Sequence, residues 1–402
     1  MTRIARPRPG GSGVGRRRRW RWVRRGALGV GLVLVAAAGA GWAVYAKLDS
    51  NITADEAAAA ELERYEKERP TSLVRGAQNI LLIGSDSRAG SGNRRYGRDS
   101  GTERSDTTIL LHLSAGRRSA TAVSIPRDLM VDVPGCRRPD GTRSDPMFAM
   151  FNYAFQVGGS ACTIRTVERL TDIRIDHHMV VDFHGFKEMI DALQGVEICL
   201  TEPINDKAAK LRLPAGKVTL NGEQALGYVR ARKSLGDGSD TDRMHRQQRF
   251  LAALVNKVQS NDVLLNPVRL YPVLDAATSS LTTDPALANL RGLYELVRGV
   301  RDIPTERVQF LTVPRESYIH NANRDQLKEP EAERLFERLR TDTPVVVADS
   351  PELHQAPPRV SSHRSSPRDN GKSTAQRPAT PAEPTPPPPT FRGNTAAENP
   401  CR

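Results

Sequence analysis

Residues 230–248 (RARKSLGDGSDTDRMHRQQ) hold the densest group of side chains that could do chemistry. The group consists of Arg230, Arg232, Asp240, Arg243, Arg246 and Gln247. Arginine presents a rigid fork of donors that matches phosphate oxygens bidentately, which lysine cannot do. Because permanent cations this close together repel one another, the segment predicts an anionic ligand, and phosphate fits best.

The phase of a helix over 241–258 supports this interpretation. Its apolar stripe would consist of Leu251, Leu254, Val255 and Val258. At about 100° per residue, Arg243 and Gln247 fall on or beside the stripe, so they should point toward the protein body. The alternative is a solvated charged face at a helix start, but such a face would lie opposite the stripe.

Two further segments, NILLIGSDSR (79–88) and RSDTTILLHLSAGRRSATAVSIPRD (104–128), place charged residues at the ends of apolar runs. The runs at 79–84, 107–113 and 119–125 are typical of buried strands. Asp86 follows the first run, Asp106 precedes the second, and Arg127 follows the third.

The link between the second and third runs, residues 114–118, is short enough for an antiparallel hairpin. If the first strand is also antiparallel to the second, Asp86, Asp106 and Arg127 converge at one edge of a sheet. Asp128 would then orient Arg127, or would serve only in the turn.

Two carboxylates beside a cluster of arginines suggest a hard divalent cation together with phosphate. Mg²⁺ commonly takes one or two carboxylates and completes its shell with water and phosphate oxygens, and Mn²⁺ is the alternative. Asp86 as a turn residue and Asp106 as a cap before Thr-Thr are the ordinary interpretations. His177 and His178 lie at a predicted strand start with no other metal ligand nearby, so they are expected to serve packing. No zinc-ligand spacing, P-loop, G-x-S-x-G or H-E-x-x-H pattern is present.

In this chain order, the motifs G-x-D-x-R, R-x-D-T, S-I-P-R-D and R-x-R…D-x-x-R-x-x-R-Q resemble the LytR–CpsA–Psr family of cell-envelope enzymes over roughly residues 78–260. Arginine outnumbers lysine about five to one, which favours the actinobacterial members. One difference is Asp242, where the family usually has a small residue. The resemblance implies a phosphotransferase that moves a glycopolymer from a polyprenyl-pyrophosphate carrier to a cell-wall sugar hydroxyl, expected on peptidoglycan, with formation of a phosphodiester.

The resemblance also assigns expected roles. Metal binding falls to Asp86 and Asp106, and the predicted catalytic residues are Asp86, Asp106, Arg127, Arg230 and Arg232. The predicted pyrophosphate-binding residues are Arg88, Arg104, Arg127, Arg230, Arg232, Arg243, Arg246 and Gln247. Asp128 and Asp240 are expected to hold arginines in place, and no general base is identified. Two alternatives stay open: a non-catalytic envelope sensor or binding module for anionic polymers, and a lipid-pyrophosphate phosphatase with water as acceptor.

The net charge of the 402-residue chain is +13, of which ten arginines before residue 26 supply +10, so the remainder carries only +3. Nucleic-acid binding by the folded part therefore has little support. Residues 26–46 are apolar, uncharged and long enough to span a bilayer. The arginine-rich run before them predicts a cytoplasmic N-terminus and an extracytoplasmic catalytic domain; a cleaved signal peptide is the alternative.

The four cysteines suit an oxidising compartment. Cys136 and Cys162 lie in loop-like stretches that flank one segment and are the favoured pair. Cys199 follows GVEI in a predicted strand and is expected to be a buried thiol, while Cys401 lies in the tail. The sequence does not fix the connectivity.

The patterns divide the chain into six regions: a disordered basic tail (1–25), a transmembrane helix (26–46), a helical stalk (47–77), a catalytic domain (78–260), an α-rich extension of the same body (261–347) and a Pro-rich disordered tail (348–402). Further helices are predicted at 162–170, 183–193, 220–229 and 241–259, and further strands at 178–182 and 196–200. The predicted fold is α/β, with a mixed central sheet sandwiched between helices. A groove for the lipid is expected between the sheet and the long helix.

Overall fold

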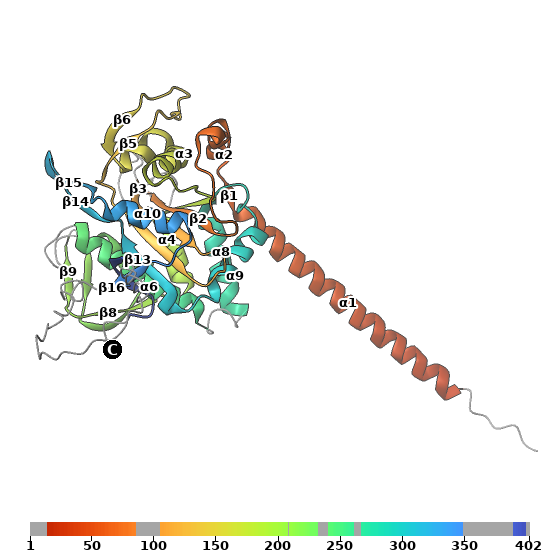
Figure 1. The fold of residues 1–402 in the computed structure, drawn as a ribbon. Coiled ribbons are helices and arrows are strands. Elements are labelled where there is room, and N and C mark those ends of the chain that lie inside the picture. The colour runs from red at the N-terminus through yellow and green to blue at the C-terminus, as the bar shows by residue number, and fades with distance from the viewer. Residues whose placement is uncertain are drawn as a thin grey trace, which may run out of the picture. The chain divides into compact units, whose positions relative to one another are not determined.

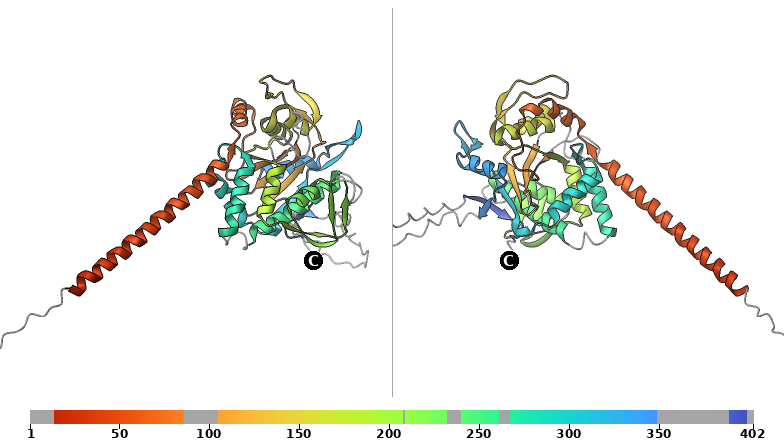
Figure 2. Two further views of the ribbon diagram at one scale, coloured as in Figure 1. Left: turned by 180° about the vertical axis from the view of Figure 1, so that it is seen from behind. Right: turned by 45° about the vertical axis from the view of Figure 1, so that its right-hand side comes forward.

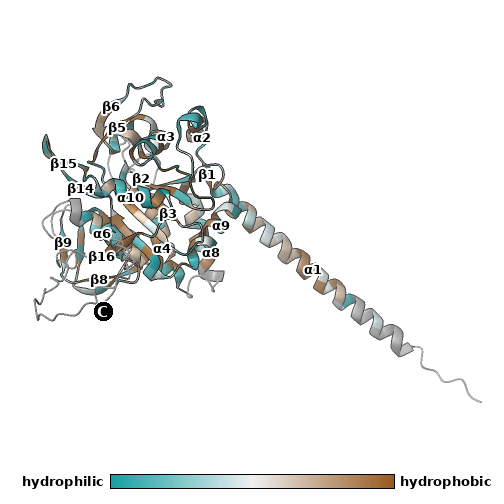
Figure 3. Ribbon diagram, in the orientation of Figure 1, coloured by the Kyte–Doolittle hydropathy of each residue, from teal (hydrophilic) through white to brown (hydrophobic). Residues whose placement is uncertain are grey.

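A computed structural model describes residues 14–85, 105–207, 209–231, 240–260, 267–348 and 389–398. The chain divides into two compact units, with the boundary between Asn51 and Ile52. The first contains helix α1 (Val14–Asn51), in which Arg25–Asn51 is long and apolar enough to cross a membrane (Figure 3). The expected span 26–46 lies inside this stretch. The prediction of disorder is wrong for 14–25, because the helix already begins at Val14.

A mixed sheet lies at the centre of the second unit, and nine of its strands lie in the described part of the chain. In spatial order they are β1 (Thr53–Ala54), β12 (Leu281–Thr283), β7 (His177–Asp182), β2 (Gln78–Ser85), β3 (Ser105–Leu113), β4 (Ala120–Ile125), β13 (Val308–Thr312), β17 (Thr390–Thr395) and β16 (Val346–Ala348). Strand β3 is antiparallel to both β2 and β4, whereas β7 runs parallel to β2 and β13 runs parallel to β4. The strands predicted at 79–84, 107–113, 119–125 and 178–182 are therefore confirmed.

Helices cover both faces of the sheet because the side chains of each buried strand alternate between two apolar clusters. Along β2, Leu81 and Ile83 belong to the cluster that contains helices α2 (Glu56–Arg64), α3 (Asn152–Thr171) and α10 (Glu331–Arg340). Ile80 and Leu82 face the other side, against α6 (Asp240–Gln259) and α9 (Leu290–Arg301). The α/β sandwich predicted from the sequence is confirmed (Figures 1 and 2).

A smaller layer extends the second face. It contains α4 (Phe183–Ala192), α5 (Gly222–Arg230), the pair β8 (Val196–Leu200) and β11 (Gly216–Leu220), and the pair β9 (Ile204–Asp206) and β10 (Leu211–Leu213). The predicted N-cap of α5 is present, since the Asn221 side chain accepts a hydrogen bond from the Gln224 backbone N–H at 2.9 Å. Strand 196–200 was predicted correctly, but it pairs with β11 and not with the central sheet.

Two hairpins, β5 (Met130–Val133) with β6 (Met147–Met150) and β14 (Arg315–Tyr318) with β15 (Asn321–Leu327), project from the body (Figure 1). Helix α8 (Pro267–Ser280) packs against α4.

The outer boundaries of the body differ from the sequence prediction. The expected stalk is part of the body, because Ala58 and Leu62 of α2 are buried in the same core as α3. The expected extension, 261–347, supplies β12 and β13 to the central sheet. The prediction of disorder over 348–402 is wrong for β17, which pairs with β13 and β16.

The disulfide between Cys136 and Cys162 is confirmed. The prediction that Cys199 is a buried thiol is wrong, because Cys199 is disulfide-bonded and only partly buried. Its partner lies outside the described residues.

Candidate functional site

The end of β2, the start of β3, the end of β4 and the end of β7 meet at one edge of the central sheet. The register pairs Gly84 with Thr107, Ser85 with Asp182, and Thr108 with Ile125. This is the edge at which the sequence analysis expected the charged residues to converge.

Asp106, Arg127 and Asp128 form a chain of ion pairs at this edge. Arg127 Nη1 lies 3.3 Å from Asp106 Oδ1, and Arg127 Nε lies 3.3 Å from Asp128 Oδ2. Their side chains are 30%, 19% and 20% exposed in chain order, so the cluster is open to a ligand without being fully solvated. The convergence of Asp106 with Arg127 and the contact of Asp128 with Arg127 are confirmed.

Several predicted site residues cannot be placed. Asp86, Arg88, Arg104 and Arg232 lie outside the described residues, as does the side chain of Asp240.

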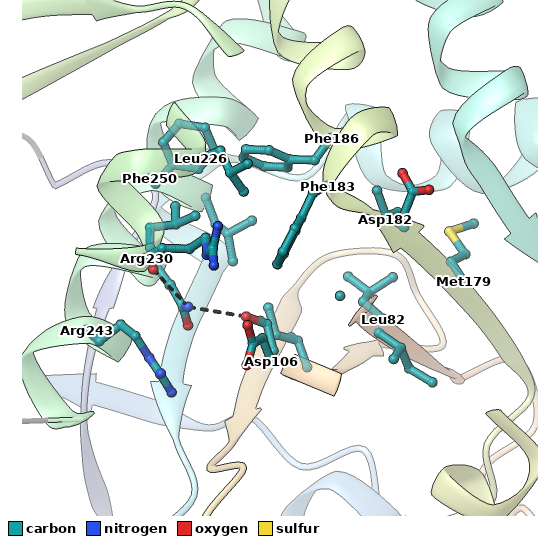
Figure 4. A pocket seen from close by; sticks show the side chains of 18 of the residues that line it. Leu82, Asp106, Met179, Asp182, Phe183, Phe186, Leu226, Arg230, Arg243 and Phe250 are labelled. Atoms are coloured by element: carbon teal, nitrogen blue, oxygen red, sulfur yellow. Dashed lines mark hydrogen bonds between the residues drawn. The ribbon is translucent and has the colours of Figure 1, made fainter. Parts of the chain in front are cut away.

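A cavity of about 360 Å³ opens between the sheet and helices α4, α5 and α6. Its walls are mainly apolar and include Leu82, Ile109, Met179, Phe186, Leu226 and Phe250. Figure 4 shows Asp106, Arg230 and Arg243 together on one side of the cavity, with Leu82 and Met179 on the other. The cavity lies where the sequence analysis expected the lipid groove, between the sheet and the long helix.

Helix α6 brings Arg243 and Gln247 to the cavity. Arg243 is only 5% exposed although it is an arginine, so the inward phase read from the sequence is confirmed. Gln247 Nε2 donates to Thr107 Oγ1 and to the Val229 carbonyl, each at 3.2 Å, and so connects α6 to β3 and α5. These positions contradict the alternative of a solvated charged face for both residues.

Arg230, the last residue of α5, is exposed and also lines the cavity. Its guanidinium carbon lies 4.5 Å from the centroid of the Phe183 ring, an attractive cation–π geometry. This contact holds the charge over the cavity.

Arg246 occupies a different place from the other arginines. It is buried, is not among the residues that line the cavity, and donates through Nη2 to the Ala231 carbonyl just after α5. In the structure, Arg246 thus stabilises the end of α5.

Asp182 lines the cavity and was missed in the sequence analysis. Its side chain accepts a hydrogen bond from the Gly185 N–H at 2.8 Å, as the N-cap of α4. The sequence contained a signal for Asp182. This aspartate ends one predicted strand and begins a predicted helix, so it lies at a strand end, as the other charged residues of the sheet edge do.

One described side chain at the sheet edge is a candidate ligand for a hard divalent cation. Asp106 offers a partly exposed carboxylate beside the cavity, whereas Asp86, the second expected ligand, lies outside the described residues. Oxygen ligands of this type, completed by water and phosphate, are what Mg²⁺ prefers. Together with the arginines, the arrangement suits binding of a diphosphate whose apolar substituent fills the cavity.

Comparison with known proteins decides the family. The LytR_cpsA_psr family profile matches residues 45–341. The chain belongs to this family. The resemblance inferred from the four motifs, at first over residues 78–260, is thereby confirmed and extended.

Relatives of this chain are named for cell-wall biosynthesis. A probable cell wall biosynthesis protein, LcpB of Corynebacterium glutamicum, is 40% identical over 210 residues, which cover 51% of this chain and 47% of LcpB. The polyisoprenyl-teichoic acid–peptidoglycan teichoic acid transferase TagT of Bacillus subtilis is 28% identical over 298 residues, or 68% of this chain and 85% of TagT. The chain spans about half the length of the first curated relatives it matches.

The fold also matches solved structures of the family. A LytR-Csp2A-Psr enzyme from Actinomyces oris superimposes with a TM-score of 0.52 at 22% identity, over 67% of this chain and 93% of that one.

Proposed function

We propose that this protein is a membrane-anchored phosphotransferase that moves a glycopolymer from a polyprenyl-pyrophosphate carrier to a sugar hydroxyl of peptidoglycan. The observation that carries the proposal is a largely apolar cavity with Arg230, Arg243 and the Asp106–Arg127 pair gathered at one side. A ligand with a lipid chain and a diphosphate has both of these properties. The names of the teichoic acid transferases among its relatives support the same class of reaction.

In the proposed reaction, the acceptor hydroxyl oxygen attacks the sugar-side phosphorus of the diphosphate. A new P–O bond forms, the bond to the bridging oxygen breaks, and polyprenyl phosphate leaves while the hydroxyl proton passes to solvent. Phosphoryl transfer depends chiefly on positioning and on neutralising charge. Arg127, Arg230 and Arg243 would supply fixed positive charge, and Gln247 would orient a phosphate oxygen.

The apolar part of the cavity would hold the first isoprene units of the carrier. Its volume of about 360 Å³ lies within the usual range for small-molecule pockets, roughly 300–1,000 Å³. The arginines at one side then fix the depth at which the diphosphate stops.

Asp86 and Asp106 would hold Mg²⁺. The bound ion would neutralise developing charge on the phosphate oxygens. Asp128, through its contact with Arg127, would keep that guanidinium aimed at the ligand.

The proposed location is the cell membrane, with a cytoplasmic N-terminus and the catalytic body outside. The helix Arg25–Asn51 is compatible with one membrane crossing, and the basic residues before it favour this orientation. The Cys136–Cys162 disulfide is consistent with an oxidising compartment.

One assay tests the proposal. The purified chain is incubated with a lipid-pyrophosphate-linked glycan, peptidoglycan fragments and Mg²⁺. We expect the glycan to be recovered on peptidoglycan through a phosphodiester, together with polyprenyl phosphate. Hydrolysis without transfer would identify a lipid-pyrophosphate phosphatase, and retention of intact donor would identify a binding module; either result would overturn the proposal.

A further inference from the structure

Helix α9 has an exposed face that the proposed reaction does not use. The helix packs Leu293 against buried Ile52 and Leu287. Beside this packed side, Tyr294 is 62% exposed and Val297 is 50% exposed. Exposed arginines at 291, 298 and 301 flank these two residues. We call Arg291, Tyr294, Val297, Arg298 and Arg301 the α9 face.

The connection to α1 determines how far this helix can lie from a membrane. Ile52, which packs against α9, directly follows Asn51, the last residue of the candidate span. The chain is helical through Asn51, and its apolar stretch ends near Ala46, so these last residues rise only about 8 Å. The headgroup layer on each side of a bilayer is about 6 Å thick. Ile52 therefore lies near the outer edge of the headgroup layer when α1 crosses the membrane.

The chemistry of the α9 face suits a headgroup layer. Tyrosine is enriched at membrane interfaces, and arginines attract anionic lipid phosphates. Two acids lie nearby: Glu295, whose carboxylate pairs with Arg291 at 3.0 Å, and the exposed Asp302, which follows Arg301 at the end of the helix. Three arginines against two carboxylates leave the face with a net positive charge. A scattered surface arginine requires no explanation. An exposed tyrosine and valine between arginines, on a helix that packs against the residue following α1, match an interfacial helix.

We infer that the α9 face rests on the anionic headgroup surface of the bilayer that α1 crosses. This inference rests on the proposed membrane anchor, and it goes beyond the proposed reaction by assigning a second, peripheral membrane contact to the catalytic body.

The contact has a consequence for the cavity. Met179 and Leu281 pack against the cluster of Ile52, Leu287 and Leu293, and both also line the cavity. These two side chains connect the apolar wall of the cavity to the residues under α9. A body seated on α9 therefore holds the apolar wall close to the membrane, where a prenyl chain resides.

A labelling experiment on the full chain tests the inference without an activity assay. Single cysteines are introduced as Val297→Cys on the α9 face, Val33→Cys inside the span, and Ile319→Cys in the turn between β14 and β15. Ile319 is 79% exposed and apolar, so it is a matched control on a different projection of the body. Each variant carries an environment-sensitive fluorophore and is reconstituted into phosphatidylglycerol–phosphatidylcholine vesicles that contain no spin label, a headgroup spin label, or a spin label deep in the acyl chains. The unsubstituted chain reports background labelling.

We expect about a twofold loss of fluorescence at 297, because an interfacial helix sits about 5–10 Å into the headgroup region. Position 319 should be unaffected, and position 33 should respond to a spin label placed deep in the acyl chains. The effect at 297 should weaken in vesicles without phosphatidylglycerol or in high salt.

Three outcomes would overturn the inference. If 33 is quenched but 297 behaves like 319, the anchor stands and the α9 contact does not. If the label at 297 shifts to the blue without lipid quenching, a protein, such as a second copy of the chain, covers the face. If 33 is not quenched, the anchor itself fails and the inference fails with it. None of these results bears on whether the body transfers glycan.

Discussion

Arg243 is the residue at which sequence reasoning and structure agree most closely. An arginine predicted on the apolar stripe of a helix has two interpretations. Either the helical phase was assigned wrongly, or the side chain points inward and binds a buried anion. The structure buries Arg243 beside the cavity, so its inward phase is confirmed, while binding of an anion stays a prediction. The residue type was informative here because a buried guanidinium must be paired and hydrogen-bonded.

The first prediction concerns Arg243→Lys. Lysine keeps the charge but loses the bidentate fork. A hydrogen bond to a charged group is worth about 1.5–3 kcal/mol, so donor binding should weaken roughly ten- to a hundredfold. Titration of the chain with a lipid-pyrophosphate donor at moderate salt measures this loss. Arg249→Lys, an exposed position on the same helix, should change the affinity less than about threefold, because an exposed pair is worth only about 0–1 kcal/mol. Equal small effects at both positions would mean that Arg243 does not bind the diphosphate.

The second prediction concerns Asp106→Asn. The change removes one proposed Mg²⁺ ligand, so transfer should fall to background. Thermal unfolding should shift little, because the Asp106–Arg127 pair is partly exposed and such pairs contribute about 0–1 kcal/mol. Asp132→Asn, at an exposed position on β5, is the control that should retain activity. Normal turnover by Asp106→Asn in excess chelator would remove the metal assignment.

The sequence predicted which charged residues gather at the site, but it did not predict which group each of them contacts. Motif spacing placed Asp106 and Arg127 at one edge because strand direction alone fixes which ends meet. It could not separate Arg243 from Arg246, which are neighbours in the motif, although one lines the cavity and the other binds the Ala231 carbonyl. That difference depends on where α5 ends, and α5 packs against α6 only in the folded body.

At the scale of elements, the carboxylate of Asp55, between β1 and α2, links this segment to α3 and β7 in addition to its sheet pairing and core packing. Asp55 Oδ1 accepts a hydrogen bond from the Ala58 N–H at 3.1 Å as the N-cap of α2. Its Oδ2 accepts one from Ser160 of α3 and lies 3.2 Å from His178 Nε2 in β7. Burial alone would raise the pKa of Asp55, but the hydrogen bonds from His178 and Ser160 outweigh it and hold that pKa below its usual value.

The third prediction concerns Asp55→Asn and pH. Because the pKa is lower in the folded state, the unfolded chain takes up the proton first as the pH falls. The stabilisation is therefore complete above the ordinary value of 3.8 and is lost as the pH falls through the folded-state value. Asparagine can still cap α2 but carries no charge, so at pH 7 the variant should lose about 1.5–3 kcal/mol of unfolding free energy.

Urea titrations at pH 7 and pH 3 test this prediction. The difference between the unsubstituted chain and Asp55→Asn should shrink at pH 3. Asp145→Asn, at an exposed position, should show no such difference at either pH. A difference in unfolding free energy between the two proteins that stays constant with pH would show that the charge of Asp55 does not contribute to stability.

Elements with a strong local pattern could be predicted, and those defined by distant partners could not. The runs that became β2, β3 and β4 are apolar and bounded by turn residues, so their existence follows from local sequence. Strand β17 (TFRGNT) has no such pattern; Phe391 is buried in it, but its backbone partners are in β13 and β16. A single aromatic residue after a proline-rich stretch gives no local reason to expect a strand.

At the scale of the whole molecule, the parts that stabilise the body are separated from the parts proposed to act on substrate. The cavity lies between the sheet and α4, α5 and α6, on one face. The Cys136–Cys162 disulfide joins the core on the other face, where Val133, Phe155 and Ala161 are buried with it. Stability and activity should therefore be separable by mutation.

The fourth prediction uses this separation. The disulfide closes a loop of 26 residues in sequence, and the chain-entropy estimate for such a loop is about 3.5 kcal/mol. The double variant Cys136→Ala, Cys162→Ala should therefore unfold roughly 7–14 °C lower, since about 1 kcal/mol shifts the Tm of a body this size by roughly 2–4 °C. Its transfer rate well below the new Tm should stay close to that of the unsubstituted chain, because neither cysteine lines the cavity. Calorimetry and the transfer assay on the same preparation measure both quantities. A large loss of transfer at low temperature, with the fold intact by circular dichroism, would show that the two faces of the sheet are coupled and that the disulfide helps to shape the site.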